Sequence, residues 1–188
     1  MTQVSDPMHN TDDVVTFLKQ QHEQIRDLFT RVMVVSGAAR EEAFLALRRL
    51  MAIHETAEEE VVHPRARHEL VDGEALVASR LEEEHHAKQA LAELETLNVD
   101  SAEFESKFRQ LRADVLAHAE AEEREEFARL KALLDDGQLN RMRKVVELAE
   151  MFAPTRPHPG VESAMGNLLV GPFAMMLDRA RDAIVGKG

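Results

Sequence analysis

The 188-residue sequence contains no cysteine, no tryptophan and no tyrosine. Without cysteine the chain can form no disulfide, no iron–sulfur cluster and no thiolate-bound zinc site, and it has no thiol nucleophile. Any bound metal must therefore be held by histidine and carboxylate side chains. Tyrosine and tryptophan are the side chains that normally store an oxidising radical, so their absence argues against radical-generating redox chemistry.

Glycine and proline are also scarce, with 8 and 6 residues. The composition is 44% hydrophobic and 31% charged, and it is rich in alanine, leucine, glutamate and arginine, which favours long helices over sheet. A chain of this length suits one domain with a proper core and a short appendage. The sequence therefore predicts an all-α fold.

Basic residues are outnumbered by acidic ones, and the formal net charge is −12 at pH 7. Such a charge repels phosphate backbones and anionic lipid headgroups, so nucleic acid and polybasic membrane binding are poor hypotheses. No stretch approaches 18 apolar residues, and the first residues, MTQVSDPMHNTDD, contain no basic segment followed by an apolar one. Neither a membrane span nor an export signal is indicated, and we expect a cytoplasmic protein.

Apolar side chains recur at steps of three and four residues, which predicts successive amphipathic helices. Capping and breaking residues place four long helices at about 11–34, 39–63, 73–97 and 100–135, and Pro64 is expected to end or kink the second. An Asp100–Glu103 capping pair is expected to start the fourth. Because the links are short, we expect an antiparallel up-down four-helix bundle.

The organisation changes after this bundle, which we assign to residues 11–135. Residues 136–152 predict a fifth, shorter helix as an additional C-terminal extension. Residues 153–188 begin with the proline-rich linker PTRPHPG and end in a short amphipathic segment. This tail can pack on its own bundle, on a protein partner or on a second copy of the chain.

Histidine and glutamate interrupt the apolar stripes at equivalent places. The first helix reads Leu, His, Ile, Phe, Val at positions 18, 22, 25, 29 and 32, so periodicity points His22 toward the core. One such histidine is more often a core residue than a ligand. However, the second and fourth helices carry His54 with Glu58 and His118 with Glu122 on their inward stripes. Residues four apart share a helix face, so each pair offers an imidazole and a carboxylate to one region.

The pattern repeats along the chain. HETAEE at 54–59 and HAEAEE at 118–123 match at an offset of 64 residues, and His22 and His85 lie 63 residues apart. These matches indicate an internal duplication. We therefore place His85 inward on the third helix, in preference to its neighbour His86.

Six candidate metal ligands result from this placement: His22, His54, Glu58, His85, His118 and Glu122. Unpaired buried charges cost several kcal/mol each, so such a cluster is expected to hold a cation or to unfold locally. Six nitrogen and oxygen ligands exceed one tetrahedral zinc ion, and the metalloprotease pattern His-Glu-x-x-His is absent. Two carboxylates that can bridge, with two imidazoles per metal, suit a pair of iron ions, or less well manganese ions, about 3.5–4 Å apart.

The combined pattern resembles the hemerythrin-like, or HHE cation-binding, family over about residues 11–135. The resemblance implies a four-helix bundle around a non-haem di-iron centre with an oxo or hydroxo bridge. It also implies that the six residues are ligands and that the two glutamates bridge the ions.

The sequence departs from the oxygen-carrying members, which place a further histidine one turn away on the third helix and an aspartate after the last histidine. Here Leu81 precedes His85 and Gln89 follows it. An extra open position argues against simple reversible oxygen carriage. Three nearby side chains are available to fill it: Glu55, His86 and His63.

The other histidines, His9, His63, His68 and His158, fall at helix ends or in loops, and we interpret them as structural or solvated. The remaining glutamate runs are most simply solvated helix faces: Glu59 and Glu60, Glu82 to Glu84, and Glu123 with Glu125 and Glu126.

A di-iron centre with open positions can bind dioxygen, react with peroxide or capture nitric oxide. The sequence has no glycine-rich nucleotide motif for an electron donor. Peroxide disproportionation supplies its own electrons, so catalase-like peroxide removal is our leading hypothesis. The alternatives are an iron or oxygen sensor that signals through the tail after residue 153, and a structural bundle with buried polar networks.

Overall fold

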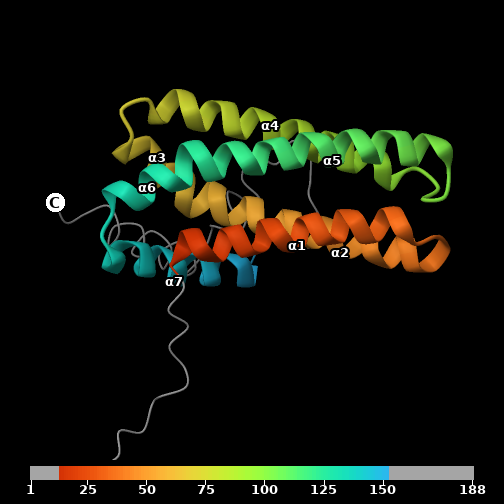
Figure 1. The fold of residues 1–188 in the computed structure, drawn as a ribbon, viewed down its shortest axis with the longest axis horizontal. Helices are drawn as coiled ribbons and strands as arrows, with labels where there is room; N and C mark the ends of the chain where they lie inside the picture. The colour runs from red at the N-terminus through yellow and green to blue at the C-terminus, as the bar shows by residue number, and fades with distance from the viewer. Residues whose placement is uncertain (1–12, 153–188) are drawn as a thin grey trace, which may run out of the picture.

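The structure is a computed structural model that describes residues 13–152 (Figure 1). Within this range the chain forms helices joined by short connections and contains no strand, so the all-α prediction is confirmed. The predicted linker and tail at 153–188 lie outside the described residues, as do His9 and His158. Across 13–152, helices long enough to cross a bilayer all lack the apolar character that crossing requires.

Four long helical rods make up most of the described chain. The first is α1 (Val14–Val34), and the third is α4 (Gly73–Glu95). The second and fourth each join three segments: α2 (Gly37–Ala57), η1 (Glu58–Val62) and α3 (His63–Glu69), then α5 (Ala102–Glu122), η2 (Glu123–Phe127) and α6 (Ala128–Leu133). Both η segments are π-helical turns. A last helix, α7 (Asp136–Phe152), follows.

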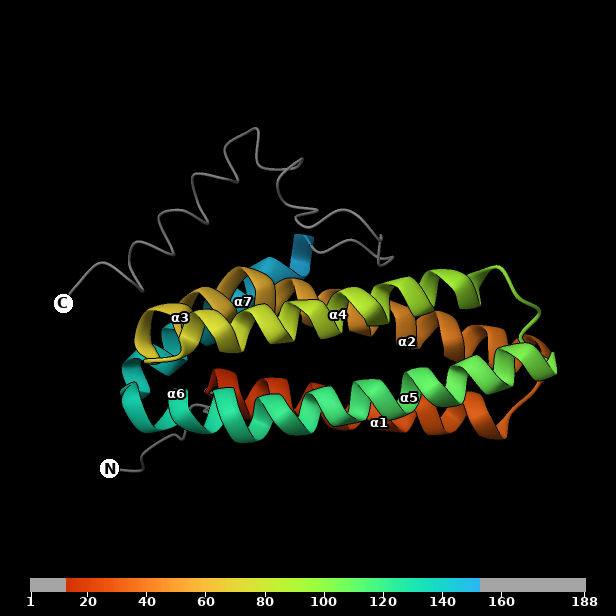
Figure 2. The same cartoon turned by 90° about the horizontal axis from the view of Figure 1, so that it is seen from above.

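The rods lie side by side along the long axis of the molecule. Figure 1 shows the α1 and α2 rods in one layer and those of α4 and α5 in the other, and Figure 2 shows α1 beside α5. The contacts agree, since α1 packs on α2 and on α5, and α4 packs on α5. The shorter α7 lies against α1, α2 and η1.

Side chains cap two of the rods at their N-termini. Asp13 accepts a hydrogen bond from the backbone N–H of Thr16 at 2.8 Å, and Ser101 accepts one from Phe104 at 3.1 Å. The expected Asp100–Glu103 capping pair is therefore wrong. Asp100 instead accepts from the backbone N–H of Gly37. Gly37 has a φ of 56°, which glycine adopts without steric cost.

Pro64 is expected from the sequence to end or kink the second helix. It does not end the rod, because helical structure continues to Glu69. The π-helical turn η1 lies just before it and places Pro64 in the first turn of α3. A missing N–H is tolerated there, since the first N–H groups of a helix have no partner in that helix.

Two apolar clusters lie on either side of the middle of the rods. One contains the stacked and edge-on rings of Phe29, Phe44, Phe104 and Phe108. The other joins α1, η1, η2 and α7 through side chains such as Leu18, Val61, Phe127 and Met142. Polar side chains occupy the space between these clusters, and the rigid apolar ends hold them in place.

Candidate metal centre

Two overlapping groups of ligand-type side chains meet between the apolar clusters. In each group the ligand atoms lie within 4.8 Å of one another, and Glu58 and Glu122 belong to both. The first group adds His22 and His54, and the second adds Glu84 and His118. Five of the six predicted ligands are thus brought together, from α1, α2, η1 and α5. The sixth member of the cluster, Glu84 on α4, was not predicted.

The three imidazoles of the cluster turn Nε2 toward the shared carboxylates. Nε2 of His54 lies 3.3 Å from Glu58 Oε2. Nε2 of His118 lies 3.1 Å from Glu122 Oε1, and Nε2 of His22 lies 3.4 Å from Glu122 Oε2. Each imidazole–carboxylate pair on one helix is spaced by four residues, which places both groups on one face.

The opposite ring nitrogens, Nδ1, are all held by oxygen acceptors. The three contacts are His22 with Glu123 at 3.0 Å, His54 with Gln21 at 2.9 Å and His118 with Glu83 at 2.7 Å. A ring that donates from Nδ1 keeps its Nε2 lone pair for a metal. This is the usual arrangement of metal-binding histidines.

The contact between His22 and His54 tests whether a cation fits. Their Nε2 atoms lie only 2.9 Å apart, and both rings are buried. When both rings carry their proton at Nδ1, as their oxygen acceptors favour, the two Nε2 atoms present lone pairs to each other. A cation beside these atoms removes that repulsion.

The carboxylates of the cluster also indicate that a cation fits there. Glu58 and Glu122 are 0% exposed, and neither oxygen of either side chain has a hydrogen-bond partner. One oxygen of buried Glu84 is likewise without a hydrogen bond. Buried carboxylates are costly unless cations compensate them. Glu122 faces His118, and Glu84 faces Lys88. Glu58, in contrast, faces His54, whose lowered pKa favours the neutral ring. The donor set, three imidazoles and three carboxylates, fits a pair of iron or manganese ions.

Neighbouring groups shift the pKa values of the two His-x-x-x-Glu pairs in opposite directions. Burial, then the adjacent His22, holds the pKa of His54 well below its usual range, whereas burial and Glu122 raise the pKa of Glu58 well above its own. Burial opposes the charged form of His118, but Glu122 and Glu83 raise its pKa to about 10. Burial favours a higher pKa for Glu122, but His118 and then His22 outweigh it and hold this pKa well below the usual range.

The structure does not bring His85 into the cluster, in contrast to the sequence prediction. His85 is half-buried, and its Nε2 lies 2.8 Å from the side-chain nitrogen of Gln89. The buried positions of α4 are Gly73, Val77, Arg80, Glu84, Ala87, Leu91 and Leu94. This line passes through Glu84, and the next residue is turned by about 100°. The reference residue used for the prediction, Leu81, is only partly buried.

None of the three side chains considered for an extra ligand position enters the two groups. His86 is exposed, and Glu55 instead pairs with Lys88, whose Nζ lies 3.6 Å from Glu55 Oε2. Burial, partly offset by Lys88, raises the pKa of Glu55 to about 8. His63 contacts a member of the cluster, Glu84, rather than the cluster centre.

His63 and three of the supposedly solvated glutamates, Glu60, Glu84 and Glu126, are in fact buried. His63 is 1% exposed and lies 2.7 Å from Glu84 and 3.0 Å from Glu126. Glu126 is 0% exposed. The glutamate runs at 82–84 and 123–126 are therefore not simply solvated faces. Buried positions recur at steps of three and four residues along α4, and Glu84 occupies one of them. Because some of these positions carry charged residues, the pattern is not visible as a hydrophobic stripe in the sequence.

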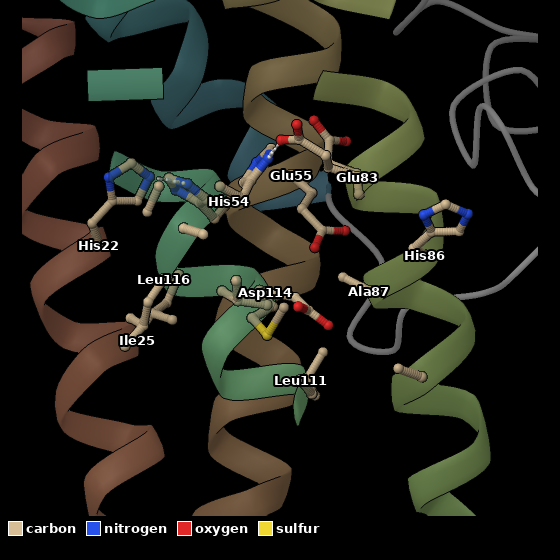
Figure 3. Close-up of a pocket in the computed structure, with 17 residues that line it drawn as sticks. His22, Ile25, His54, Glu55, Glu83, His86, Ala87, Leu111, Asp114 and Leu116 are labelled. Atoms are coloured by element: carbon tan, nitrogen blue, oxygen red, sulfur yellow. Dashed lines mark hydrogen bonds and ion pairs between the residues drawn. The ribbon is translucent and has the colours of Figure 1, made fainter. Parts of the chain in front are cut away.

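A cavity of about 440 Å³ adjoins the cluster (Figure 3). His22, His54 and His118 line it, with apolar side chains such as Ile25 and Leu111. The exposed side chains Asp114 and His86 also border it. The volume lies in the range typical of small-molecule sites.

The chain belongs to the hemerythrin HHE cation-binding domain family, whose model matches residues 13–130. The crystal structure of a hemerythrin HHE cation-binding domain-containing protein from Mycobacterium kansasii is similar in fold. That match has a TM-score of 0.66 and 17% identity, and it covers 90% of this chain and 99% of the other. A protein from Nostoc sp. named DNA nickase is 29% identical over 140 residues. The match covers 73% of this chain but only 38% of that protein.

Proposed function

We propose that this protein binds two iron ions, in preference to manganese, between Glu58 and Glu122, and that it removes hydrogen peroxide in a catalase-like reaction. The observation that carries the proposal is the pair of ligand groups that share these two carboxylates, whose four oxygens have no hydrogen-bond partner. Family membership supports cation binding. His22 and His54 would hold one ion, and Glu84 and His118 the other.

The reaction is 2 H₂O₂ → 2 H₂O + O₂, in which one peroxide is oxidised to dioxygen and the other is reduced to water. Bound iron would supply the reversible electron exchange that this reaction needs. The chain supplies the surroundings. The cavity gives small neutral molecules access to the imidazoles, and its apolar walls limit competing water. Glu83, Gln21 and Glu123 fix the three rings through their Nδ1 atoms.

Four rods that turn back at each end also support the finer description of the fold as an antiparallel up-down bundle with α7 as an extension (Figure 1). In this arrangement, short links bring each ligand-bearing helix next to its neighbour in sequence.

The test is dioxygen evolution from peroxide by the iron-loaded protein, measured with an oxygen electrode. We expect evolution that depends on iron and is lost in His118→Ala. His85→Ala is the matched control, since His85 lies on a ligand-bearing helix but outside the cluster. Absence of iron-dependent evolution from a protein that binds two iron ions would refute the catalase-like reaction and leave metal binding standing.

A second proposed function is an iron or oxygen sensor that signals through the C-terminal tail. One observation favours it: α7, which precedes the tail in sequence, packs on α1, α2 and η1, three elements that carry cluster residues. If sensing is the function, iron loading should change the rate at which trypsin cleaves beyond residue 152. An unchanged cleavage rate in the loaded protein would contradict it.

A further inference from the structure

The last described helix is connected to the cluster by hydrogen bonds. Glu150 on α7 accepts a hydrogen bond from the side-chain nitrogen Nε2 of Gln21 at 2.6 Å. The other end of the same amide, Gln21 Oε1, lies 2.9 Å from Nδ1 of His54. The family match ends at residue 130, whereas α7 begins at Asp136, so this connection starts outside the matched segment.

When Glu150 is ionised, the chemistry of these three groups permits one arrangement of protons. Burial raises the pKa of Glu150, and the hydrogen bond from Gln21 partly offsets this effect. An ionised carboxylate only accepts hydrogen bonds, so it requires the NH₂ end of the Gln21 amide. The carbonyl end then faces His54, and a carbonyl only accepts. Nδ1 of His54 must therefore carry the proton, and Nε2 keeps a lone pair. It is Nε2 that faces Glu58 and His22 in the cluster.

The burial of Gln21 and His54 enforces this arrangement of protons. Gln21 is 5% exposed and His54 is 4% exposed, so water does not readily replace the contact between them, whereas Glu150 is half-buried. A buried polar group left without its partner is unfavourable enough to select one amide orientation and one tautomer. The two other imidazoles of the cluster meet carboxylates directly at Nδ1. Of the three imidazoles, His54 is the one connected to a carboxylate through an amide, that of Gln21. The orientation of this amide must therefore be fixed.

We propose that Glu150 is a positioning residue that orients the Gln21 amide and so holds His54 in the tautomer able to bind a metal ion through Nε2. This inference rests on the metal-binding part of the proposed function and is independent of the peroxide reaction.

The decisive variant replaces the hydrogen-bond acceptor at one end of the connection, Glu150, with a donor. In Glu150→Lys, an ammonium donor requires the carbonyl end of Gln21, so the NH₂ end turns toward His54 and its Nδ1 must accept. His54 then carries its proton on Nε2, where it blocks the metal. Glu147→Lys is the matched control, because Glu147 is an exposed residue of the same helix and the charge change is identical.

Two measurements follow the change in the full-length chain. Long-range ¹H–¹⁵N spectra of metal-free, ¹⁵N-histidine-labelled protein report the tautomer of His54. We expect the Nδ1–H form in the wild type and in Glu147→Lys, and the Nε2–H form in Glu150→Lys. Anaerobic titration with Fe(II) against a competing chelator should show at least a tenfold loss of affinity in Glu150→Lys alone, as is usual when a partner of a ligand is lost.

A double variant separates positioning from packing. In Gln21→Glu with Glu150→Lys, the new carboxylate accepts from Nδ1 of His54 and pairs with the lysine, so the Nδ1–H form and the affinity should return. A merely structural role of α7 predicts no such rescue.

The proposal is overturned if Glu150→Lys matches Glu147→Lys in both measurements, or if the double variant folds without regaining either property. If the wild type binds no iron, the proposed function fails, while the spectra still decide the role of Glu150.

Discussion

The two His-x-x-x-Glu halves of the centre have nearly the same sequence and opposite electrostatics. HETAEE and HAEAEE both end an α-helix and lead into a π-helical turn. Yet His54 and Glu58 have pKa values shifted toward their neutral forms, whereas His118 and Glu122 have values shifted toward the charged pair. The difference comes from neighbours on other helices. His54 meets another imidazole, and His118 meets Glu83 on α4.

This comparison shows that a repeated motif fixes which residue types meet but not how they share charge. In the absence of metal, one half approaches a neutral pair and the other an ion pair. Two cations at the shared carboxylates would make the halves more alike, since both glutamates would then be ionised and both imidazoles neutral.

Loss of a shared carboxylate should have the largest effect on the centre. We expect Glu122→Gln to lower the iron content, measured by elemental analysis after loading, from about two ions per chain to nearly none, because both ions lose a ligand. His85→Ala is the control and should keep its iron. An iron-free His85→Ala variant would show that His85 is a ligand, as the sequence predicted, whereas a Glu122→Gln variant that stays loaded would contradict both the predicted ligand set and the observed cluster.

The two shared glutamates should differ in their effect on the metal-free protein. At pH 7, Glu58→Gln should raise the free energy of unfolding by about 1–3 kcal/mol, because it removes a buried carboxyl group that resists ionisation. Glu122→Gln should lower it by a similar amount, because His118 and His22 lose their carboxylate partner. Urea unfolding followed by circular dichroism measures both. If both variants change the free energy of unfolding in the same direction, the proposed electrostatic contrast between the two halves is wrong.

The pH dependence of the free energy of unfolding should show that the half formed by His118 and Glu122 is charged. The pKa of His118 is raised to about 10 in the folded state from 6.5 in the unfolded state. Its contribution is therefore fully present below pH 6.5 and is lost as the pH rises toward 10. Between these limits, metal-free wild type should lose about 1–3 kcal/mol more unfolding free energy than His118→Gln. Parallel curves for the two proteins would contradict the charged state of His118.

The smallest effect should come from narrowing the cavity, which Ala90 of α4 lines. We expect Ala90→Phe to keep its iron but to slow peroxide consumption severalfold, because the added ring obstructs access to the imidazoles. Ala46→Phe, on the exposed face of α2, is the control. A variant that consumes peroxide at the wild-type rate would show that the cavity is not the route of entry.

The sequence was most informative where apolar residues flank the polar ones. Leu18, Ile25 and Phe29 around His22 define an inward stripe, and the structure buries all four side chains. Strong periodicity on both sides of a polar residue therefore locates it well.

The third long helix lacks such flanks, and there the prediction failed. Its buried line includes Arg80 and Glu84, whose charges make them look solvent-facing in sequence. The register could not be found from hydrophobicity, because Arg80 and Glu84 have partners on other rods: Arg80 pairs with Glu125, and Glu84 contacts His63. The connection from Glu150 to His54 was equally hidden, since it joins residues 96 positions apart.

The π-helical turns η1 and η2 begin at Glu58 and Glu123, at corresponding places within one residue. Such a turn is a local widening of an α-helix and is usually found at functional sites. In both rods the same local backbone form therefore adjoins the His-x-x-x-Glu pair. The electrostatic contrast between the halves arises on this common backbone from the side chains that neighbouring helices bring to it.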